Sequence, residues 1–146
     1  MKDKIVKEYH SKETGISVLT IQNKYGRFTG DSLCHPDDLE HYSEFTGLRY
    51  AEIRANMDYA KLRLNQEKIK LKTMENLLKD INYSERCRNE ACPEVMRKIR
   101  LKIRDYTQSV DDWQNLYNHL RKAVKVEDET RTKIINRRTK KDNQEN

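Results

Sequence analysis

The sequence predicts a mostly α-helical protein in which a small N-terminal antiparallel β unit precedes a long antiparallel helical hairpin, a coiled coil. Only 35% of the 146 residues are apolar and 37% are charged. The chain therefore cannot fill a thick core, but a coiled-coil seam needs only about two apolar residues in seven. Four glycines and two prolines favour long helices with few turns. Two long stretches also repeat apolar residues at alternating spacings of three and four, as such a seam requires.

The β unit is predicted from strand character that occurs only near the N-terminus. Residues 16–22 (ISVLTIQ) are mostly β-branched, residues 23–26 (NKYG) are a turn signal, and residues 27–34 can return as a second strand. Residues 5–10 alternate weakly and are predicted to form a third strand. A hairpin alone is marginally stable, so we expect this unit to pack on another element.

A short helix is predicted over residues 36–45, ending at Thr46–Gly47. Pro36 suits the first helical position, and the acidic residues that follow it complement the positive end of the helix dipole. The predicted organisation is thus a β unit with a short helix over residues 1–47, the hairpin over residues 48–126 and a basic, flexible tail over residues 127–146.

The hairpin is predicted to consist of helices over residues 48–81, which contain no Pro or Gly, and 93–126. The polar segment 82–93 joins them, and two helices joined by a short loop fold back antiparallel. The first apolar stripe consists of Tyr50, Ile53, Met57, Ala60, Leu64, Glu67, Leu71, Met74, Leu78 and Ile81. The second consists of Met96, Ile99, Ile103, Tyr106, Val110, Trp113, Tyr117, Leu120 and Val124.

The best register pairs apolar residues in every layer except one. The small Ala60 falls opposite Trp113, which needs the room, so we predict that Trp113 is buried against Ala60. The exception is Glu67 opposite Tyr106. A buried acid with a raised pKa can serve a function, whereas a lone polar residue in a seam more often fixes its register. We favour the second interpretation, with a hydrogen bond from the Tyr106 hydroxyl to the carboxylate.

A second apolar line flanks the first stripe, and an isolated helical pair cannot cover it. We consider three occupants: the β unit, a second copy of the chain, or a foreign protein. The candidate partner-binding line consists of Ala55, Leu62, Ile69 and Leu77.

The net charge of +6 comes from the C-terminal tail, because without its six bases the other 24 basic residues equal the 24 acidic ones. An acid-free cluster of this kind favours polyanions. No aromatic residue is interleaved for base stacking, so any nucleic-acid binding would be backbone-directed and salt-sensitive. The candidate polyanion-binding residues are Arg131, Lys133, Arg137, Arg138, Lys140 and Lys141.

Residues 30–33 (GDSL) match the four-letter signature of the GDSL esterases, in which the serine is the nucleophile. That chemistry also needs an Asp-x-x-His pair near the C-terminus, but His119 has Leu116 three residues before it. We therefore interpret the motif as a turn at a strand end. With no nucleophile–base pair and no phosphate-binding loop in the sequence, we predict no enzymatic activity.

The cysteines and histidines of the sequence raise the question of a zinc site. The spacing of Cys87 and Cys92 is unusual for structural zinc, and the first long helix separates that loop from Cys34 and the nearby His35 and His41. We predict neither a metal nor another cofactor. The odd number of cysteines predicts reduced thiols. The sequence has no apolar N-terminal segment and no long apolar run, so we predict no signal peptide and no membrane span. Together these features predict a cytoplasmic location.

Residues 25–63 (YGRFTGDSLCHPDDLEHYSEFTGLRYAEIRANMDYAKLR), followed by a charged helical hairpin, resemble small accessory proteins of bacteriophages of low-GC Gram-positive hosts. The resemblance implies a viral protein of the kind that binds and disables a host factor. The sequence as a whole predicts a non-enzymatic protein-binding module. Its predicted partner is a second copy of the chain, a host protein, or both. The alternative is a nucleic-acid-associated accessory protein that uses the basic tail.

Overall fold

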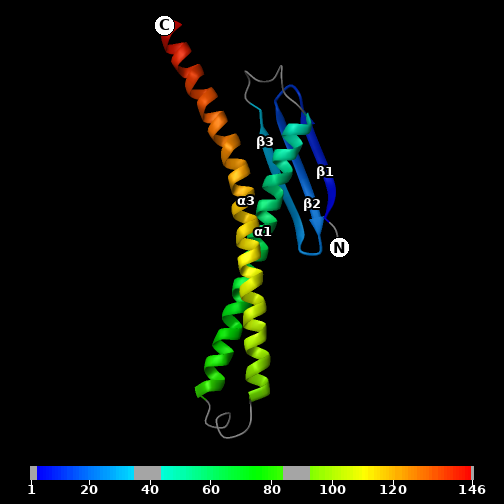
Figure 1. The fold of residues 1–146 in the computed structure, drawn as a ribbon. Helices are drawn as coiled ribbons and strands as arrows, with labels where there is room; N and C mark the ends of the chain where they lie inside the picture. The colour runs from blue at the N-terminus through cyan, green and yellow to red at the C-terminus, as the bar shows by residue number, and fades with distance from the viewer. Residues whose placement is uncertain (1–2, 35–43, 84–92, 146) are drawn as a thin grey trace. The chain divides into compact units, whose positions relative to one another are not determined.

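The computed structural model describes residues 3–34, 44–83 and 93–145 and confirms the predicted fold class, a three-stranded antiparallel sheet followed by two long packed helices (Figure 1). The elements, in chain order, are β1 (Lys4–Ser11), β2 (Ile16–Asn23), β3 (Gly26–Leu33), α1 (Glu44–Tyr83) and α3 (Pro93–Glu145). The three predicted strands are thus confirmed almost to the residue.

The chain divides into two compact units, and the division falls within both helices. One unit, which we call the sheet unit, comprises Met1–Tyr59 and Tyr117–Asn146. The other, the hairpin unit, comprises Ala60–Leu116.

The sheet has the order β1-β2-β3, so β2 is its central strand. Both pairings are antiparallel, and the β1–β2 pairing is interrupted by an irregularity between Ile5 and Lys7. Gly15, in the connection between β1 and β2, and Gly26, the first residue of β3, have positive φ angles of 71° and 134°. Glycine reaches this region without the steric cost that other residues pay, so both connections can be short.

One face of the sheet packs on the first turns of α1. Leu19 and Ile21, two residues apart on β2, are each 2% exposed and form a core with Ala51 and Ala55 of α1. This period of two is that of a strand with one buried face. The Phe28 and Tyr59 rings extend this core, with centroids 5.2 Å apart. The β unit therefore packs on a helix, as a marginally stable meander must.

Gly30 allows the helix and the sheet to approach so closely. A Cβ added at Gly30 would overlap the carbonyl oxygen of Ala51 and the backbone nitrogen of Ala55. The guanidinium of Arg54 donates a hydrogen bond to the carbonyl oxygen of the next strand residue, Asp31. The GDSL motif thus belongs to strand β3 itself, and the predicted turn at this position is wrong.

Helix α1 begins at Glu44 and continues through Thr46–Gly47, so the predicted break there is wrong. A glycine in a helix costs about 1 kcal/mol relative to alanine, but Gly47 is buried at a spacing of four residues from Ala51, and Ala51 at the same spacing from Ala55. Gly47 therefore lies on the same face of α1 as Ala51 and Ala55, which pack against the sheet. Most of the predicted short helix at 36–45 lies outside the described residues.

Helix α3 continues to Glu145, well past residue 126, where the seam pattern predicted its end. The backbone of the basic tail is therefore helical. No Pro or Gly follows Pro93, and Glu127 and Glu129 each precede a basic residue by four positions. An acid four residues before a base is a spacing that stabilises a helix without any packing.

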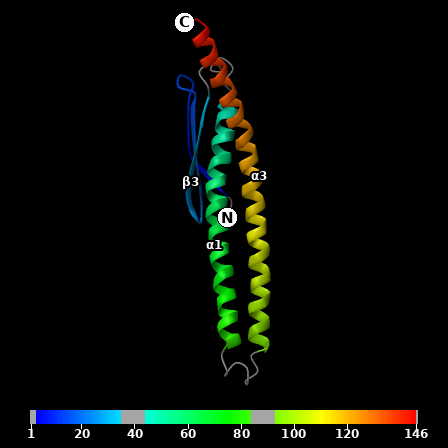
Figure 2. The same ribbon diagram turned by 90° about the vertical axis from the view of Figure 1, so that its left-hand side faces the viewer.

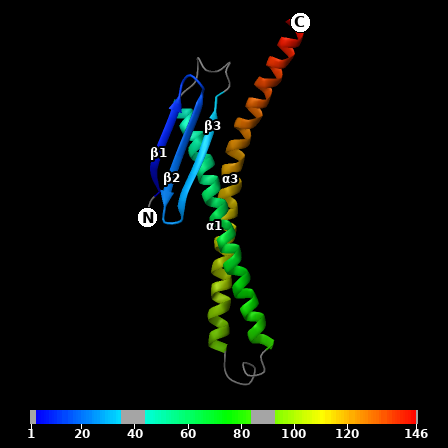
Figure 3. The ribbon, with the colours of Figure 1, turned by 180° about the vertical axis from the view of Figure 1, so that it is seen from behind.

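In the hairpin unit, α1 and α3 run side by side along the predicted seam (Figures 2 and 3). Every stripe residue of this unit is buried or half-buried, while most of their neighbours are exposed. The fully buried positions are Ala60, Leu64, Glu67 and Ile99. Trp113 is half-buried and not fully buried, so the predicted extent of its burial is wrong.

Candidate interaction surfaces

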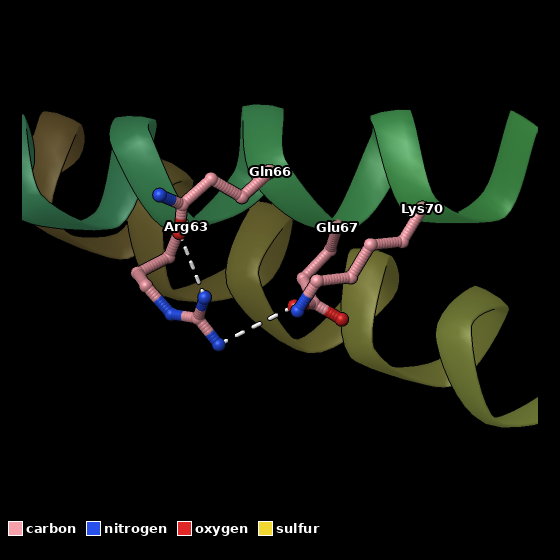
Figure 4. A network of polar contacts seen from close by, with 4 residues as sticks. All are labelled: Arg63, Gln66, Glu67 and Lys70. Carbon is pink, nitrogen blue, oxygen red and sulfur yellow. Dashed lines mark hydrogen bonds and ion pairs between the residues drawn. The ribbon is translucent and has the colours of Figure 1, made fainter. Parts of the chain in front are cut away.

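The buried carboxylate of Glu67 is the centre of a polar network within the hairpin unit (Figure 4). Its side chain is 5% exposed, and its Oε1 accepts hydrogen bonds from Lys70 Nζ at 3.1 Å and Arg63 Nη2 at 3.3 Å. Arg63 also donates to the side-chain oxygen of Gln66 at 2.8 Å. Residues three and four positions apart on one helix are neighbours, so α1 alone supplies this ion-pair network.

Burial raises the pKa of the Glu67 carboxyl group, and this is the largest single effect. Hydrogen bonds from Lys70 and Ser109, together with the positive charges of Lys70 and Arg63, outweigh it and hold the pKa below its ordinary value. The alternative of a functional acid with a raised pKa is therefore wrong. The carboxylate is satisfied by cations and a hydroxyl rather than by the predicted Tyr106.

The two cations of this network also cover aromatic residues of α3. The Arg63 guanidinium carbon lies 5.4 Å from the centroid of the Trp113 ring, and Lys70 Nζ lies 6.0 Å from that of Tyr106. The two contacts are seven residues apart on both helices and run in opposite directions, as an antiparallel heptad pair requires. The arginine that covers one face of Trp113 explains why this ring needs no full burial, since a guanidinium stacks favourably on an aromatic face.

The predicted partner-binding line is covered at one end and open at the other. Ala55 is fully buried in the core of the sheet unit, so it cannot belong to a partner-binding surface in this fold. Leu62 is half-buried, whereas Ile69 is 67% exposed and Leu77 is 41% exposed. The remaining line, which we call the apolar line, is Leu62–Ile69–Leu77 on the part of α1 that belongs to the hairpin unit.

The C-terminal basic cluster lies on the last turns of α3, but its side chains can be placed at one position only. Lys140 is exposed. The side chains of the other candidate residues lie outside those that the structure describes; they are Arg131, Lys133, Arg137, Arg138 and Lys141.

A second basic cluster, which we did not predict, occupies the first turns of α3. Residues 97–104 (RKIRLKIR) contain five basic residues and no acid. All five are exposed. The basic residues are visible in the sequence, but the apolar residues between them give the segment the spacing of the seam.

The residues of the esterase-like motif do not form a catalytic site. Ser32 is 3% exposed, and its cross-strand neighbour Ser17 is fully buried, with its Oγ 3.2 Å from His10 Nδ1. A nucleophile must reach its substrate, and these hydroxyls face the packed side of the sheet. A pocket between the sheet and the start of α1 has a volume of about 190 Å³, smaller than the roughly 300 Å³ at which small-molecule sites begin, and neither serine lines it. It is lined by Glu8, Leu19, Phe45, Leu48, Arg49 and Glu52.

Among the described residues, no group of three acidic, histidine or cysteine side chains could hold a metal ion. Cys34 is half-buried and forms no disulfide bond with a described residue. The other residues considered above as zinc ligands lie outside the described residues; they are His35, His41, Cys87 and Cys92. In the part of the chain that the structure describes, neither helix has a stretch long and apolar enough to cross a bilayer.

Comparison of the chain with protein-family models, with curated proteins and with solved structures finds no match.

Proposed function

We propose that the protein is a non-enzymatic binding module that uses the apolar line of its helical hairpin to bind another protein. The observation that carries this proposal is the exposure of Ile69. At 67% it is the most exposed large apolar residue described in the hairpin unit, and it lies between Leu62 and Leu77 on one helix. An apolar side chain in water gains about 1.5–3 kcal/mol when a partner buries it fully.

The surroundings of the line fit a protein interface. Exposed charged residues flank Ile69 on α1, namely Lys61, Lys68, Lys72 and Glu75. An apolar centre with a polar rim is the usual anatomy of such an interface. In the same unit, the two cation–aromatic contacts and the hydrogen bond from Ser109 to Glu67 join α1 to α3. A preorganised hairpin loses little entropy on binding.

The kind of partner follows from the resemblance to phage accessory proteins, which favours a host defence protein or a host enzyme that is disabled by direct binding. Such an inhibitor needs no chemistry of its own. It needs only an affinity high enough to occupy its target, and a few buried apolar anchors can supply most of that.

The test is capture of a binding protein from a nuclease-treated lysate of a low-GC Gram-positive host, with wild type and two variants. Ile69→Asp places a charge in the centre of the apolar line. Val95→Asp is the matched control, because Val95 is 49% exposed on α3 outside the line. We expect wild type and Val95→Asp to retain one and the same protein and Ile69→Asp to lose it by at least about tenfold, or 1.4 kcal/mol. Equal retention by both variants would contradict the proposal.

A second candidate function is binding of nucleic acid through the C-terminal cluster. The observation that favours it is that α3 is helical through the whole cluster. Lys133, Arg137 and Lys141 follow one another at intervals of four residues, a spacing that places them on one helix face. A helix with such a face would contact phosphates rather than bases.

A further inference from the structure

We propose that three arginines near the start of α3, Arg97, Arg100 and Arg104, form a binding surface for the phosphate backbone of a nucleic-acid duplex. We call them the arginine stripe. This activity goes beyond the proposed protein binding, because the stripe lies on α3 and the apolar line lies on α1.

The three arginines share one face of a regular helix. They are three and four residues apart, the spacing of neighbours along a helix surface, and all three are exposed. Seven residues of α-helix rise by about 10 Å. Because each strand of a duplex carries one phosphate per roughly 3.4 Å of axis, a stripe of this length matches about three phosphates of one strand.

The stripe carries nearly uncompensated positive charge. Its one ion pair in the described part of the chain joins Arg97 to Glu94 at 3.9 Å, between side chains that are 66% and 73% exposed. A contact of this length and exposure contributes little. Lys98 and Lys102 add two further exposed charges to the same segment. These five bases are the longest acid-free basic run whose side chains the structure describes.

The position of the stripe argues against a purely structural role. Residues 97–104 lie in the first three turns of α3, which begins at Pro93, and therefore near the positive end of the helix dipole. The helix dipole stabilises cations only at the opposite end of a helix, and its effect falls off within one turn, so the fold gains no stability from these charges through the dipole. Charges that add nothing to the stability of the helix and have almost no partner in the described part of the chain favour a partner outside it.

The composition of the segment favours a duplex over a single strand and over a protein partner. Residues 97–104 contain no aromatic side chain on which an unpaired base could stack, so a single strand gains nothing beyond its charge. Leu101, 41% exposed, is the only exposed apolar residue among them, whereas a protein interface needs a cluster of apolar or aromatic anchors. Arginine, with its planar fork of donors, is well suited to phosphate oxygens.

The test measures binding of the full-length chain to a fluorescent DNA duplex and an RNA duplex of the same length over a series of salt concentrations. The variant Arg97→Gln/Arg100→Gln/Arg104→Gln removes the stripe and keeps good helix formers. The control Lys4→Gln/Lys7→Gln/Lys12→Gln removes the same charge from exposed positions of the sheet unit. Circular dichroism checks that each variant keeps the helical content of wild type.

Each neutralised phosphate contributes about 0.9 to the slope of log K against log salt, so we expect the stripe variant to lower that slope by two to three units. At about 0.1 M salt its affinity should fall by at least tenfold, while the control stays within about threefold of wild type. The inference is overturned if wild type does not bind either duplex at low salt, or if the control loses as much as the stripe variant. It is also overturned if the stripe variant binds like wild type, which would assign the binding to the C-terminal cluster. A wild type that prefers anionic phosphatidylserine vesicles or a poly-glutamate peptide to both duplexes would overturn it too.

Discussion

Single residues decide where the main elements of this protein can pack. Gly30 is small because a helix backbone lies where its side chain would be. Glu67 is charged within an otherwise apolar seam because two cations of its own helix and a serine of the next one hold it there. Gly30 is explained by the neighbouring helix, and Glu67 by cations of its own helix together with a serine of the neighbouring one.

Gly30→Ala should destabilise the sheet unit by about 1–3 kcal/mol, because the added methyl group meets backbone atoms that cannot rotate away. Asp31→Ala is the matched control at the next position of β3, where the side chain is exposed. Urea denaturation followed by circular dichroism measures both. A midpoint for Gly30→Ala equal to that of the control would show that helix α1 and the sheet have room to separate.

The lowered pKa of Glu67 gives its network a definite pH dependence. Its pKa in the folded chain lies below the reference value of 4.5, so the ionised form favours folding. The resulting stability is fully present above about pH 4.5 and is lost as the pH falls through the folded pKa. We expect Glu67→Gln to be less stable than wild type at pH 7, by about 1–3 kcal/mol, and the difference to shrink at pH 3.

Urea unfolding at the two pH values measures this, with Glu75→Gln as a control at an exposed position of the same helix. The control should change stability by no more than about 0.5 kcal/mol at pH 7. A Glu67→Gln variant whose deficit persists undiminished at pH 3 would mean that packing, and not charge, keeps a carboxylate at this position.

At the scale of elements, the features that were predicted correctly are those recorded by a periodic spacing of apolar residues. Alternation located the three strands, and the three-four repeat located the seam, because each pattern directly records which face is buried. The same reasoning misjudged both long helices at their outer ends. A heptad marks burial rather than helicity, so residues after 126 were assigned to a tail although their charges suit a helix.

The start of α1 was missed for a different physical reason. Gly47 carries the local signal of a helix end, and its actual use becomes visible only when it is seen buried on one face with Ala51 and Ala55. The same packing removed Ala55 from the predicted partner-binding line, because β2 and β3 cover it. Ile69 and Leu77, which have no such cover, remain exposed as predicted. The arginine stripe was not predicted because its residues alternate with apolar residues, and the period of those apolar residues is that of the seam.

At the scale of the whole molecule, the seam is thinner than a self-sufficient core. Only Ala60, Leu64 and Ile99 among the apolar stripe residues of the hairpin unit are fully buried, and the others remain half-buried. Two helices packed along one line cannot shield residues on both sides of that line. Burial of the exposed Ile69 and Leu77 by a second chain would therefore add the third layer that the hairpin unit lacks.

In the absence of a target protein, we accordingly expect the protein to form a homodimer through the apolar line at tens of micromolar, in which two hairpins pack as a four-helix arrangement. A target protein would bind in place of the second copy. Light scattering after size exclusion should give twice the chain mass of 17.5 kDa for wild type. Ile69→Asp should return the mass to that of one chain, because a charge at the centre of an apolar interface loses its water without gaining a partner. Val95→Asp should leave the dimer intact. A wild-type mass of one chain at this concentration would contradict the dimer and leave a foreign protein as the occupant of the apolar line.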